Sequence, residues 1–474
     1  MPFLRHFKEK KQKQESGNEN IMKKCISYYV AALVGKAMIH GMHLMKRNGT
    51  NLPGEVALKL CPQLLSQFQM PKNVIVVTGT NGKTTVTNLI GNALKKRGDT
   101  LITNPFGGNV DTGIASLLLA NSNLNGTLYA DTLLLEMDER SAERILPYVQ
   151  PDYLICTNLQ RDSMKRNAHA EFIFEFLNRN IPKKTTLISN ADDLISSALV
   201  PEQPHIYFGV ALLPNEVPTN DSLVCDIVNC PKCGTRLQFQ FRHYNHIGQA
   251  VCPKCGFCNK KANYQVTAVE DCTATILHNG KEEHYPIPND RITDIYNSAA
   301  VIAFLRTYGL SEQETAACMQ GSEIVKSRYD TLSSHGKPVY ISLAKGQNPI
   351  ACSAACDFVR KESGKKAVIL ILEDFYDRRR TSENIAWIYE TDFEFLKQDN
   401  IVQIIVGGKR AMDYLVRLLI AGIDRNRIVC CASETETVQY LQWDKFEKLM
   451  ILYDLYNTES LAQIKQQLQE VAEA

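Results

Sequence analysis

The chain has 474 residues, 44% of them hydrophobic and 22% charged, which excludes a wholly disordered or fibrous protein. At about 150 residues per domain, roughly three domains are expected. The 53 Lys and Arg against 51 Asp and Glu leave a net charge of +2, and this balance argues against nucleic acid as a partner. Fifteen cysteines in so long a chain do not fit the disulfide framework of a small secreted domain. We therefore expect reduced thiols and a cytoplasmic location.

The N-terminal region gives no targeting signal. Residues 1–20 are polar and mixed in charge, so a loose tail is predicted rather than a secretory leader. A helix is predicted over 22–46. The most apolar part of that helix, 25–45, is interrupted by Lys36 and His40 and is too polar to span a membrane.

From residue 73, short β-branched runs alternate with helical stretches, which predicts an α/β fold with a parallel sheet covered on both faces. The alternation stops between 215 and 263 and then resumes. Predicted strands are 74–77, 132–135, 153–157, 339–343, 367–372, 402–406, 427–430 and 449–452; predicted helices are 84–96, 141–146, 295–308, 351–360 and 411–421, before a final helix. We expect an ATP-binding domain over 21–315, with an insert at about 222–262, and a smaller α/β domain over 325–474.

The segment Gly79-Thr80-Asn81-Gly82-Lys83-Thr84-Thr85 lies between a predicted strand and a predicted helix. In such a loop, glycines let backbone N–H groups turn toward phosphate oxygens, and the helix N-terminus adds positive potential. Lys83 would add a charge and Thr84 would offer its hydroxyl to Mg²⁺. Val77 stands where the usual loop has glycine, so this is a shorter variant. We predict an exposed ATP-binding loop, in which Lys83→Ala changes stability by less than about 1 kcal/mol.

This variant resembles the nucleotide loop of the Mur ligase superfamily, whose members join carboxylates to amines through an acyl phosphate. Segment 134–139 resembles the family's acidic motif, in which Glu136 would hold Mg²⁺, and segment 157–162 resembles its Thr-Asn-Leu-x-Arg-Asp motif. Segment 294–300 resembles the helix start whose asparagine, here Asn297, meets the adenine. Glu136 alone could be a solvated surface acid, but after a phosphate loop a carboxylate for Mg²⁺ is expected.

Two matching Cys-Pro-Lys-Cys-Gly knuckles lie in the insert, with eighteen residues between the inner cysteines. Two such pairs at this separation can close a tetrahedral thiolate site on Zn²⁺, and a site with all four positions filled is structural. The predicted ligands are Cys230, Cys233, Cys252 and Cys255. The basic residues of the insert are scattered, so we do not expect this zinc ribbon to bind nucleic acid.

A Mur-type ATPase domain with an inserted zinc ribbon and a shorter α/β domain resembles the MurT family, from about residue 21 onward. The resemblance implies ATP-dependent amidation of the D-glutamate α-carboxylate of lipid II to D-isoglutamine. It also implies only peripheral contact with this membrane-bound substrate. No class-I nucleophile elbow is visible, and Cys352 and Cys356 in an Ala- and Ser-rich helix are interpreted as buried thiols. A GatD-like class-I glutaminase is therefore implied as the partner that supplies ammonia.

In that family the C-terminal domain lends an acid that orients the partner's histidine. Segment 387–394 is similar to the family's Trp-Ile-Trp-Asp-x-Asp-Phe-Glu, with Glu390 in place of the first aspartate and Asp392 kept. Both are therefore candidates for that acid. In the other interpretation, Glu390, Asp392 and Glu394 alternate on the outer face of an extended segment and face water.

The flanking sequence departs from the family pattern over 381–387, and 343–349 carries an insertion. Two alternatives thus stay open beside the amidotransferase. One is a stand-alone ligase of the folylpolyglutamate type, which needs an amine site and no partner. The other is a diverged ATP-binding paralogue without catalysis.

Overall fold

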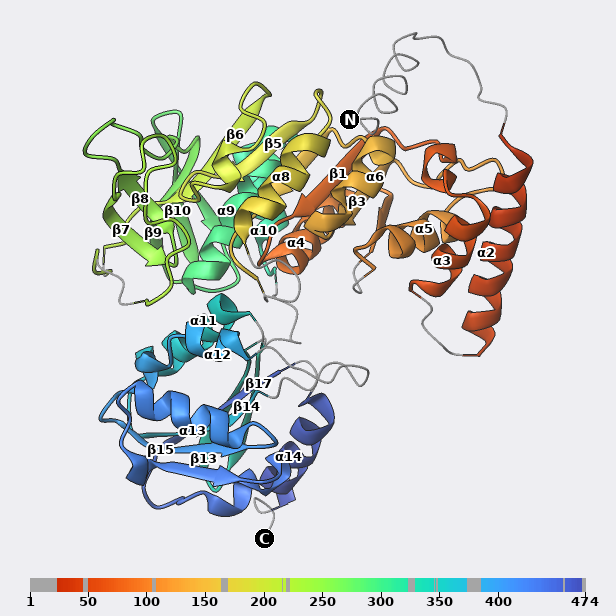
Figure 1. Cartoon of the computed structure of the whole chain (residues 1–474). Helices are drawn as coiled ribbons and strands as arrows, with labels where there is room; N and C mark the ends of the chain where they lie inside the picture. The colour runs from red at the N-terminus through yellow and green to blue at the C-terminus, as the bar shows by residue number, and fades with distance from the viewer. Residues whose placement is uncertain are drawn as a thin grey trace, which may run out of the picture.

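The structure is a computed structural model that contains two α/β units, one above the other in Figure 1. It describes residues 24–45, 50–104, 108–162, 169–214, 216–218, 222–322, 329–344, 346, 348–372, 385–454 and 457–470. The predicted tail 1–20 and residues 381–384, which depart from the family motif, lie outside these ranges. Among the described residues, no helix is long and apolar enough to cross a membrane.

The larger unit is built on one sheet. Its strands are β1 (Asn73–Thr78), β2 (Leu101–Thr103), β3 (Thr132–Glu136), β4 (Tyr153–Cys156), β5 (Thr186–Asn190), β6 (His205–Val210), β9 (Tyr264–Glu270), β10 (Thr273–His278) and β11 (Lys281–Pro286). Within the described residues their order is β11-β10-β9-β6-β5-β4-β1-β3-β2. The pairs from β2 to β6, and β6 with β9, are parallel, whereas β9, β10 and β11 form an antiparallel meander.

Helices cover both faces of this sheet because its strands are apolar on both sides. In β1, Val74 and Val76 belong to one core, and Ile75 and Val77 belong to the other. The first core contains residues from α2 (Ile26–Leu44), α3 (Leu52–Leu60), α5 (Asp111–Ala120), α6 (Ala142–Val149) and α8 (Ala170–Asn180); the second contains residues from α4 (Lys83–Arg97), α9 (Ile292–Thr307) and α10 (Glu312–Met319).

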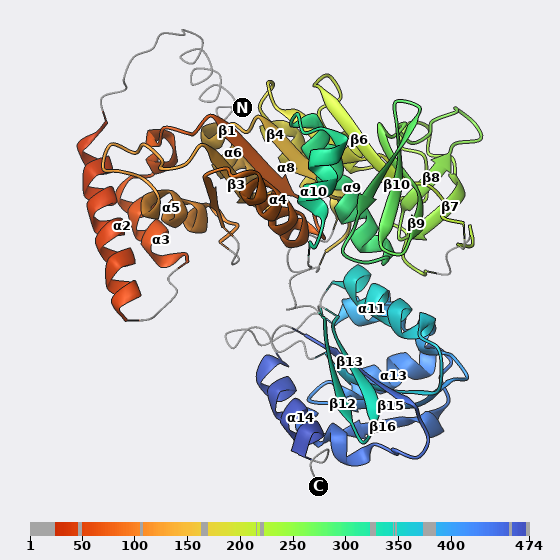
Figure 2. The same ribbon diagram turned by 180° about the vertical axis from the view of Figure 1, so that it is seen from behind.

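The cysteine-rich insert contains a two-stranded antiparallel sheet of β7 (Gln238–Tyr244) and β8 (Ile247–Val251). It has a small core of its own, in which Leu194, Leu237 and Ala250 pack beside the cysteines. The insert lies at one end of the larger unit and α2 lies at the other end, as both views show (Figures 1 and 2).

The smaller unit has a second sheet in the order β12-β13-β17-β14-β15-β16, in which only β12 and β13 pair antiparallel among the described strands. Its strands are β12 (Tyr329–Ser334), β13 (Lys337–Leu343), β14 (Lys366–Ile371), β15 (Ile401–Gly407), β16 (Ile428–Cys431) and β17 (Lys448–Tyr453). Its helices are α11 (Pro349–Lys361), α12 (Ala386–Glu390), α13 (Ala411–Ile420) and α14 (Thr458–Glu470). Figure 2 shows α11 on the side that faces the larger unit.

The predicted strands and helices are confirmed to within a few residues, and strands β2, β5, β6, β7, β8, β12 and the meander were not predicted. The edge strand β11 has the sequence Lys-Glu-Glu-His-Tyr-Pro, whose outer positions are polar and exposed, so it carries little strand signal. The interpretation of 390–394 as an extended segment facing water is wrong. Helix α12 ends at Glu390, Asp392 is buried, and a 3₁₀ turn follows at Phe393–Leu396.

Candidate functional site

The loop between β1 and α4 has the geometry of an anion-binding site. Gly79 and Gly82 have φ values of +122° and +89°. A Cβ at Gly79 would lie 2.2 Å from Thr157 Oγ1, and one at Gly82 would lie 2.2 Å from Asn297 Oδ1, so both positions require glycine. No side chain caps the N-terminus of α4. The N–H groups of its first turn therefore point outward with the positive end of the helix, where a phosphate can accept from them.

The segment that follows β4 fixes the rest of the loop. Thr80 N donates to Asn158 O at 2.8 Å, and Asn81 N donates to Asn158 Oδ1 at 3.1 Å. Thr157 Oγ1 donates to Asn81 O at 2.6 Å. These bonds make the backbone of 79–82 part of a rigid support before any ligand binds, which is the arrangement that phosphate recognition needs.

Lys83 lies inside the site and is paired with a second acid. Its Nζ donates to Gly79 O and, at 3.0 Å, to Glu139 Oε1; the two side chains are 14% and 3% exposed. Burial by itself would lower the pKa of Lys83, but the charge and hydrogen bond of Glu139 raise it, and Glu136 adds to the rise. The ammonium group therefore stays charged. The expectation of an exposed loop with little packing is wrong at this residue.

Glu139 was missed by sequence reasoning, although a signal was present. It is the last residue of the predicted acidic segment 134–139 and lies in a 3₁₀ turn, Glu139–Ser141, that points its carboxylate back to the loop. Acidic residues are rarely buried unless they are paired, and Lys83 was the nearest predicted cation. Of the three acids Glu136, Asp138 and Glu139, Glu139 is therefore the one that forms a buried ion pair with Lys83.

Glu136 ends β3, which pairs with β1 so that Val77 lies opposite Glu136. Parallel strands bring their carboxyl ends to one edge, so the Glu136 carboxylate lies at the same edge as the loop. Its Oε1 accepts from Asn109 Nδ2 at 3.0 Å, and Asn104 bonds both its backbone N–H and its carbonyl. Asn297 faces Gly82 from α9. The two adjacent threonines that follow Lys83 differ in burial: Thr84 is half-buried and Thr85 is buried.

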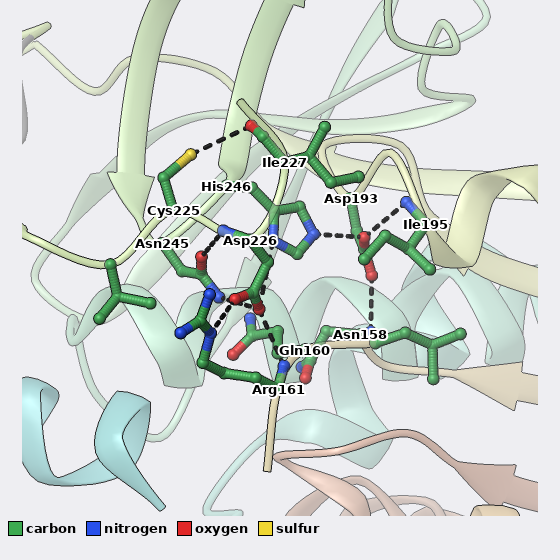
Figure 3. A network of polar contacts seen from close by, with 12 residues as sticks. Asn158, Gln160, Arg161, Asp193, Ile195, Cys225, Asp226, Ile227, Asn245 and His246 are labelled. Atoms are coloured by element: carbon green, nitrogen blue, oxygen red, sulfur yellow. Dashed lines mark hydrogen bonds and ion pairs between the residues drawn. The ribbon is translucent and has the colours of Figure 1, made fainter. Parts of the chain in front are cut away.

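A buried polar network extends from this site to the insert (Figure 3). Arg161 N donates to Asp226 Oδ2 at 2.8 Å, and its guanidinium group pairs with the same carboxylate. Asn245 Nδ2 donates to Asp226 Oδ2 at 2.7 Å, and His246 Nε2 lies 2.8 Å from Asp193 Oδ1. Burial alone would raise the pKa of Asp226, but the charges of His246 and Arg161 and the hydrogen bonds of this network lower it.

Among the described residues, the C-terminal unit contacts the larger unit through the polar side chains of Glu390, Asp392 and Asn348, and through the Phe358 ring of α11, over which the Arg291 guanidinium lies. Glu390 Oε1 pairs with Arg161 Nη1 at 2.8 Å. Asp392 is only 1% exposed, and its two oxygens accept from Ser222 Oγ and from Leu223 N, both at 2.6 Å. Burial raises the pKa of Asp392, and these hydrogen bonds oppose the rise. The two acids predicted to serve a partner subunit are therefore engaged with this chain's own N-terminal unit.

The third contact is Asn348, which reaches the nucleotide loop itself. Its Nδ2 donates to Asn81 Oδ1 at 3.2 Å and to Asp162 Oδ1 at 3.1 Å. Its Oδ1 accepts from Ala351 N at 2.9 Å and so caps the N-terminus of α11. One buried side chain thus joins the first turn of a helix in the C-terminal unit to the loop in the other unit.

The four predicted cysteine ligands gather in the insert. Their sulfurs all lie within 4.8 Å of one another, with Cys230 and Cys255 at 3.5 Å and Cys233 and Cys252 at 3.4 Å. Each knuckle closes on a glycine of positive φ, +72° at Gly234 and +70° at Gly256. The other nearby thiols do not join the group: Cys225 bonds Ile227 O, and Cys258 is exposed.

Comparison with known proteins identifies the family. A model of the Mur ligase middle domain matches residues 77–213, and a model of the MurT ligase C-terminal domain matches residues 345–456. The MurT subunit of the glutamine-hydrolyzing lipid II isoglutaminyl synthase of Staphylococcus aureus (strain COL) is 31% identical over 407 residues, which cover 85% of this chain and 89% of that protein. This chain belongs to the MurT family. The MurT subunit of Streptococcus pneumoniae is 29% identical over 387 residues, covering 80% of this chain and 84% of that one.

Solved structures extend the comparison to the fold of this MurT-family chain. A pseudomurein peptide ligase type C from Methanothermus fervidus superposes with a TM-score of 0.64 at 17% identity, covering 86% of this chain and 81% of that one. The MurF ligase from Thermotoga maritima, solved in complex with ADP, gives 0.55 at 16% identity and covers 89% and 84%. The predicted Mur ligase fold is confirmed. MurT proteins and Mur ligases are ATP-dependent ligases.

Proposed function

We propose that this chain is the ATP-dependent synthetase subunit of a lipid II isoglutaminyl synthase. In this function the D-glutamate α-carboxylate of the lipid II stem peptide attacks the γ-phosphate of ATP and releases ADP. Ammonia then attacks the acyl phosphate and expels phosphate, which leaves D-isoglutamine. The observation that carries the proposal is the similarity to named MurT subunits over about 85% of the chain, together with an intact loop at 79–85.

The residues around the loop fit ATP and Mg²⁺. We assign the first-turn N–H groups of α4 and the Lys83 ammonium to the phosphates, and Asn297 to the nucleotide on the side of α9. Thr84 and Glu136 would hold Mg²⁺, because a hydroxyl and a carboxylate at one sheet edge are the hard oxygen donors that this ion prefers. When bound, the ion withdraws charge from the transferred phosphoryl group. Preformed donors aimed at the phosphates supply the rest of the electrostatic stabilisation.

The ammonia would come from a GatD-like class-I glutaminase. Two observations support a partner. The relatives are named as subunits of a glutamine-hydrolyzing enzyme, and Cys352 and Cys356, which we interpreted as buried thiols, are fully buried in α11 and cannot meet a substrate. We propose that the acid for the partner's histidine comes from Glu390 or Asp392. Of the two, Glu390 is the more accessible, since its side chain is 31% exposed.

Two variants test this acid in the complex with the glutaminase. If an acid orients the partner's imidazole, Asp392→Asn or Glu390→Gln should lower glutamine hydrolysis steeply, because an amide cannot stabilise an imidazolium. Amidation with ammonium chloride should then be spared. If both variants hydrolyse glutamine normally, neither acid completes the partner's triad. If amidation with ammonium chloride falls equally, the acids serve only the contact between the two units.

We also propose that the four cysteines hold one structural Zn²⁺. A tetrahedral site with Zn–S bonds of about 2.3 Å separates its sulfurs by about 3.8 Å, close to the 3.4 and 3.5 Å between paired sulfurs here. Metal analysis should find about one zinc per chain. Cys233→Ser should lower zinc content and solubility, because metal binding and folding are linked, whereas Cys258→Ser should change neither. Full zinc occupancy in Cys233→Ser would contradict the four-ligand site.

The proposed activity is tested with purified chain and partner, lipid II, ATP, and either glutamine or ammonium chloride. We expect ADP, phosphate and the amidated lipid, and none of these with Lys83→Ala. Addition of an amino acid without the partner would instead support a stand-alone ligase. ATP binding without carboxylate-dependent turnover would support a non-catalytic paralogue. With lipid II as substrate, the protein would work at the cytoplasmic face of the membrane.

A further inference from the structure

The outer face of α2 exposes mostly apolar side chains, with the polar His40 among them. The inner face packs against α3 and α5 through Tyr28, Ala31, Ala32 and Gly35, which are buried. On the opposite side, Ile26, Val30, Leu33 and Leu44 are 83%, 45%, 57% and 74% exposed. A helix on the surface of a soluble domain ordinarily presents polar side chains to water, so this helix departs from the rule.

The exposed residues form one continuous stripe. Positions 26, 30, 33, 37, 40 and 44 follow one another at steps of three and four, which places them on one side of a helix. Ala37 and His40 fill the middle of this stripe, and its length is roughly 27 Å at 1.5 Å per residue. Contiguous apolar patches of this kind mark interaction sites.

The charged residues in and around α2 indicate what kind of surface its outer face binds. The sequence of α2 contains no acidic residue. Its one lysine, Lys36, turns inward and donates to the carbonyls of Leu119 and Ser122, so it does not reach the outer stripe. Lys24, just before the helix, also turns inward and donates to the Gln67 carbonyl at 2.5 Å. In the sequence, Lys23 precedes the helix and Lys46-Arg47 follow it, and the first 23 residues contain six Lys or Arg and three Glu. An apolar ridge between basic ends is complementary to the surface of an anionic bilayer.

We propose that the outer face of α2 docks in the plane of an anionic lipid surface. The inference rests on the proposed function, in which the substrate is a lipid held in that surface. Lying in the interface agrees with the absence of any membrane-spanning helix among the described residues. In both views α2 lies at the outer edge of the larger unit, so docking there leaves the insert at the far end clear of lipid (Figures 1 and 2).

The test measures co-sedimentation of the full chain with vesicles of phosphatidylglycerol and phosphatidylcholine that contain no lipid II. Wild type should bind, and should bind less at high salt. The double variant Val30→Glu/Leu33→Glu should lose at least about tenfold in vesicle affinity, because two charges must enter the interface. The matched control is Val416→Glu, at a side chain of α13 that is 46% exposed against 45% for Val30. This control should bind as wild type does.

Both changed positions face solvent, so the variant should fold, and an unchanged thermal melt checks this. If it melts early, Ile26→Ser in the first turn gives the same comparison with a smaller change, and full vesicle binding by that variant contradicts the proposal. Amidation of lipid II in detergent micelles should be equal for wild type and the double variant. Amidation of lipid II in vesicles should fall about tenfold in the double variant.

The outcomes separate this inference from the proposed function. Wild type that amidates lipid II in micelles but binds no vesicles overturns the docking face and leaves the function standing. Binding to vesicles without amidation of lipid II supports the docking face and overturns the function. If the double variant instead changes the oligomeric state, or loses a partner subunit while vesicle binding persists, α2 is a protein interface and the proposal is wrong.

Discussion

Lys83 has two roles: we propose that it binds phosphate, and its ammonium group also stabilises a buried acid. In a solvated loop, a lysine side chain can be removed at little cost to stability. Here its ammonium lies against Glu139, whose carboxylate is almost fully buried. Removal of one member of a buried pair leaves an uncompensated charge, which typically costs about 3–5 kcal/mol. The residue that we propose to bind phosphate therefore also neutralises a buried acid beside its own loop.

Lys83→Ala should thus lower the free energy of unfolding by about 3 kcal/mol, in addition to lowering ATP turnover at least about a hundredfold. Urea unfolding and a coupled ADP assay measure the two effects. Adding Glu139→Gln to this variant removes the unpaired charge, so most of the stability should return while turnover stays low. An unfolding curve of Lys83→Ala that matches wild type would show that the pair contributes nothing.

Asp192 makes the free energy of unfolding depend on pH. It is buried after β5, where its Oδ2 accepts from Val210 N at 2.7 Å and from Tyr296 Oη at 2.8 Å. Burial raises the pKa of Asp192 to about 6 from an ordinary value of 3.8. For an acid whose folded pKa is raised, the stabilisation is complete below the unfolded pKa and is lost as pH rises through the folded pKa.

Wild type should therefore lose about 3 kcal/mol of stability from this group as pH rises from 4 to 6. Asp192→Asn has no proton to lose, so the difference in unfolding free energy between variant and wild type should change across that window and be flat below it. Urea titrations at several pH values measure this difference. A difference that stays constant from pH 3 to pH 7 would contradict the assignment.

At the scale of elements, the loop at 79–82 and helix α4 could be predicted because their sequence signals are local. Gly79 and Gly82 before a helix, and Gly98 with φ +97° after it, mark both ends of α4 in the sequence. The cysteine knuckles are equally local, since Pro and Gly at fixed spacing determine each turn. By contrast, β9 and β10 belong to the main sheet through a pairing of β9 with β6, and no local pattern reports which strand a distant segment will join.

The link between the insert and the loop is an element-scale contact that can be tested. Asp226 of the insert pairs with Arg161, and Asn158, three residues before Arg161, accepts hydrogen bonds from the backbone N–H groups of Thr80 and Asn81. Asp226→Asn leaves Arg161 with a neutral partner, so we expect a loss of about 1–3 kcal/mol and several-fold slower ATP turnover. The control is Glu175→Gln, which removes an exposed pair with Arg179 on α8 and should cost less than about 0.5 kcal/mol.

Because the folded pKa of Asp226 is lowered, its stabilisation is present above the unfolded pKa and is lost as pH falls through the folded pKa. The difference between wild type and Asp226→Asn should therefore be largest at neutral pH and shrink in acid. If turnover is unchanged while stability falls, the insert supports the fold without influencing the nucleotide loop.

At the scale of the whole molecule, the two units meet at polar side chains that lie far apart in the sequence. Asn348 and Asn81 are separated by 267 positions, and Glu390 and Arg161 by 229. Sequence reasoning found Glu390 and Asp392 through a family motif but assigned them to another subunit. The sequence could not predict that these acids contact Arg161 and Ser222, because the relative orientation of two units depends on the surfaces in contact and not on sequence periodicity. The C-terminal unit is thereby held against the loop between β1 and α4.

Asn348 gives the most specific test of this contact between the units, because its side-chain oxygen and nitrogen make hydrogen bonds in different units. Its Oδ1 caps α11 and its Nδ2 reaches Asn81 and Asp162. Serine caps a helix as well as asparagine does but is too short to reach the loop. Asn348→Ser therefore removes two hydrogen bonds between the units, worth about 1 kcal/mol each, and keeps the cap.

We expect Asn348→Ser to lose about 2 kcal/mol of stability with the two hydrogen bonds, to turn over ATP about tenfold more slowly, and to scatter X-rays with a larger radius of gyration. Asn348→Ala loses the cap as well, so it should show the same turnover defect together with a further loss of about 1 kcal/mol of stability. Asn348→Asp keeps the cap but places a second carboxylate against Asp162, and this repulsion should open the molecule further. Normal turnover and an unchanged scattering curve in Asn348→Ser would mean that the two units are held together without this residue.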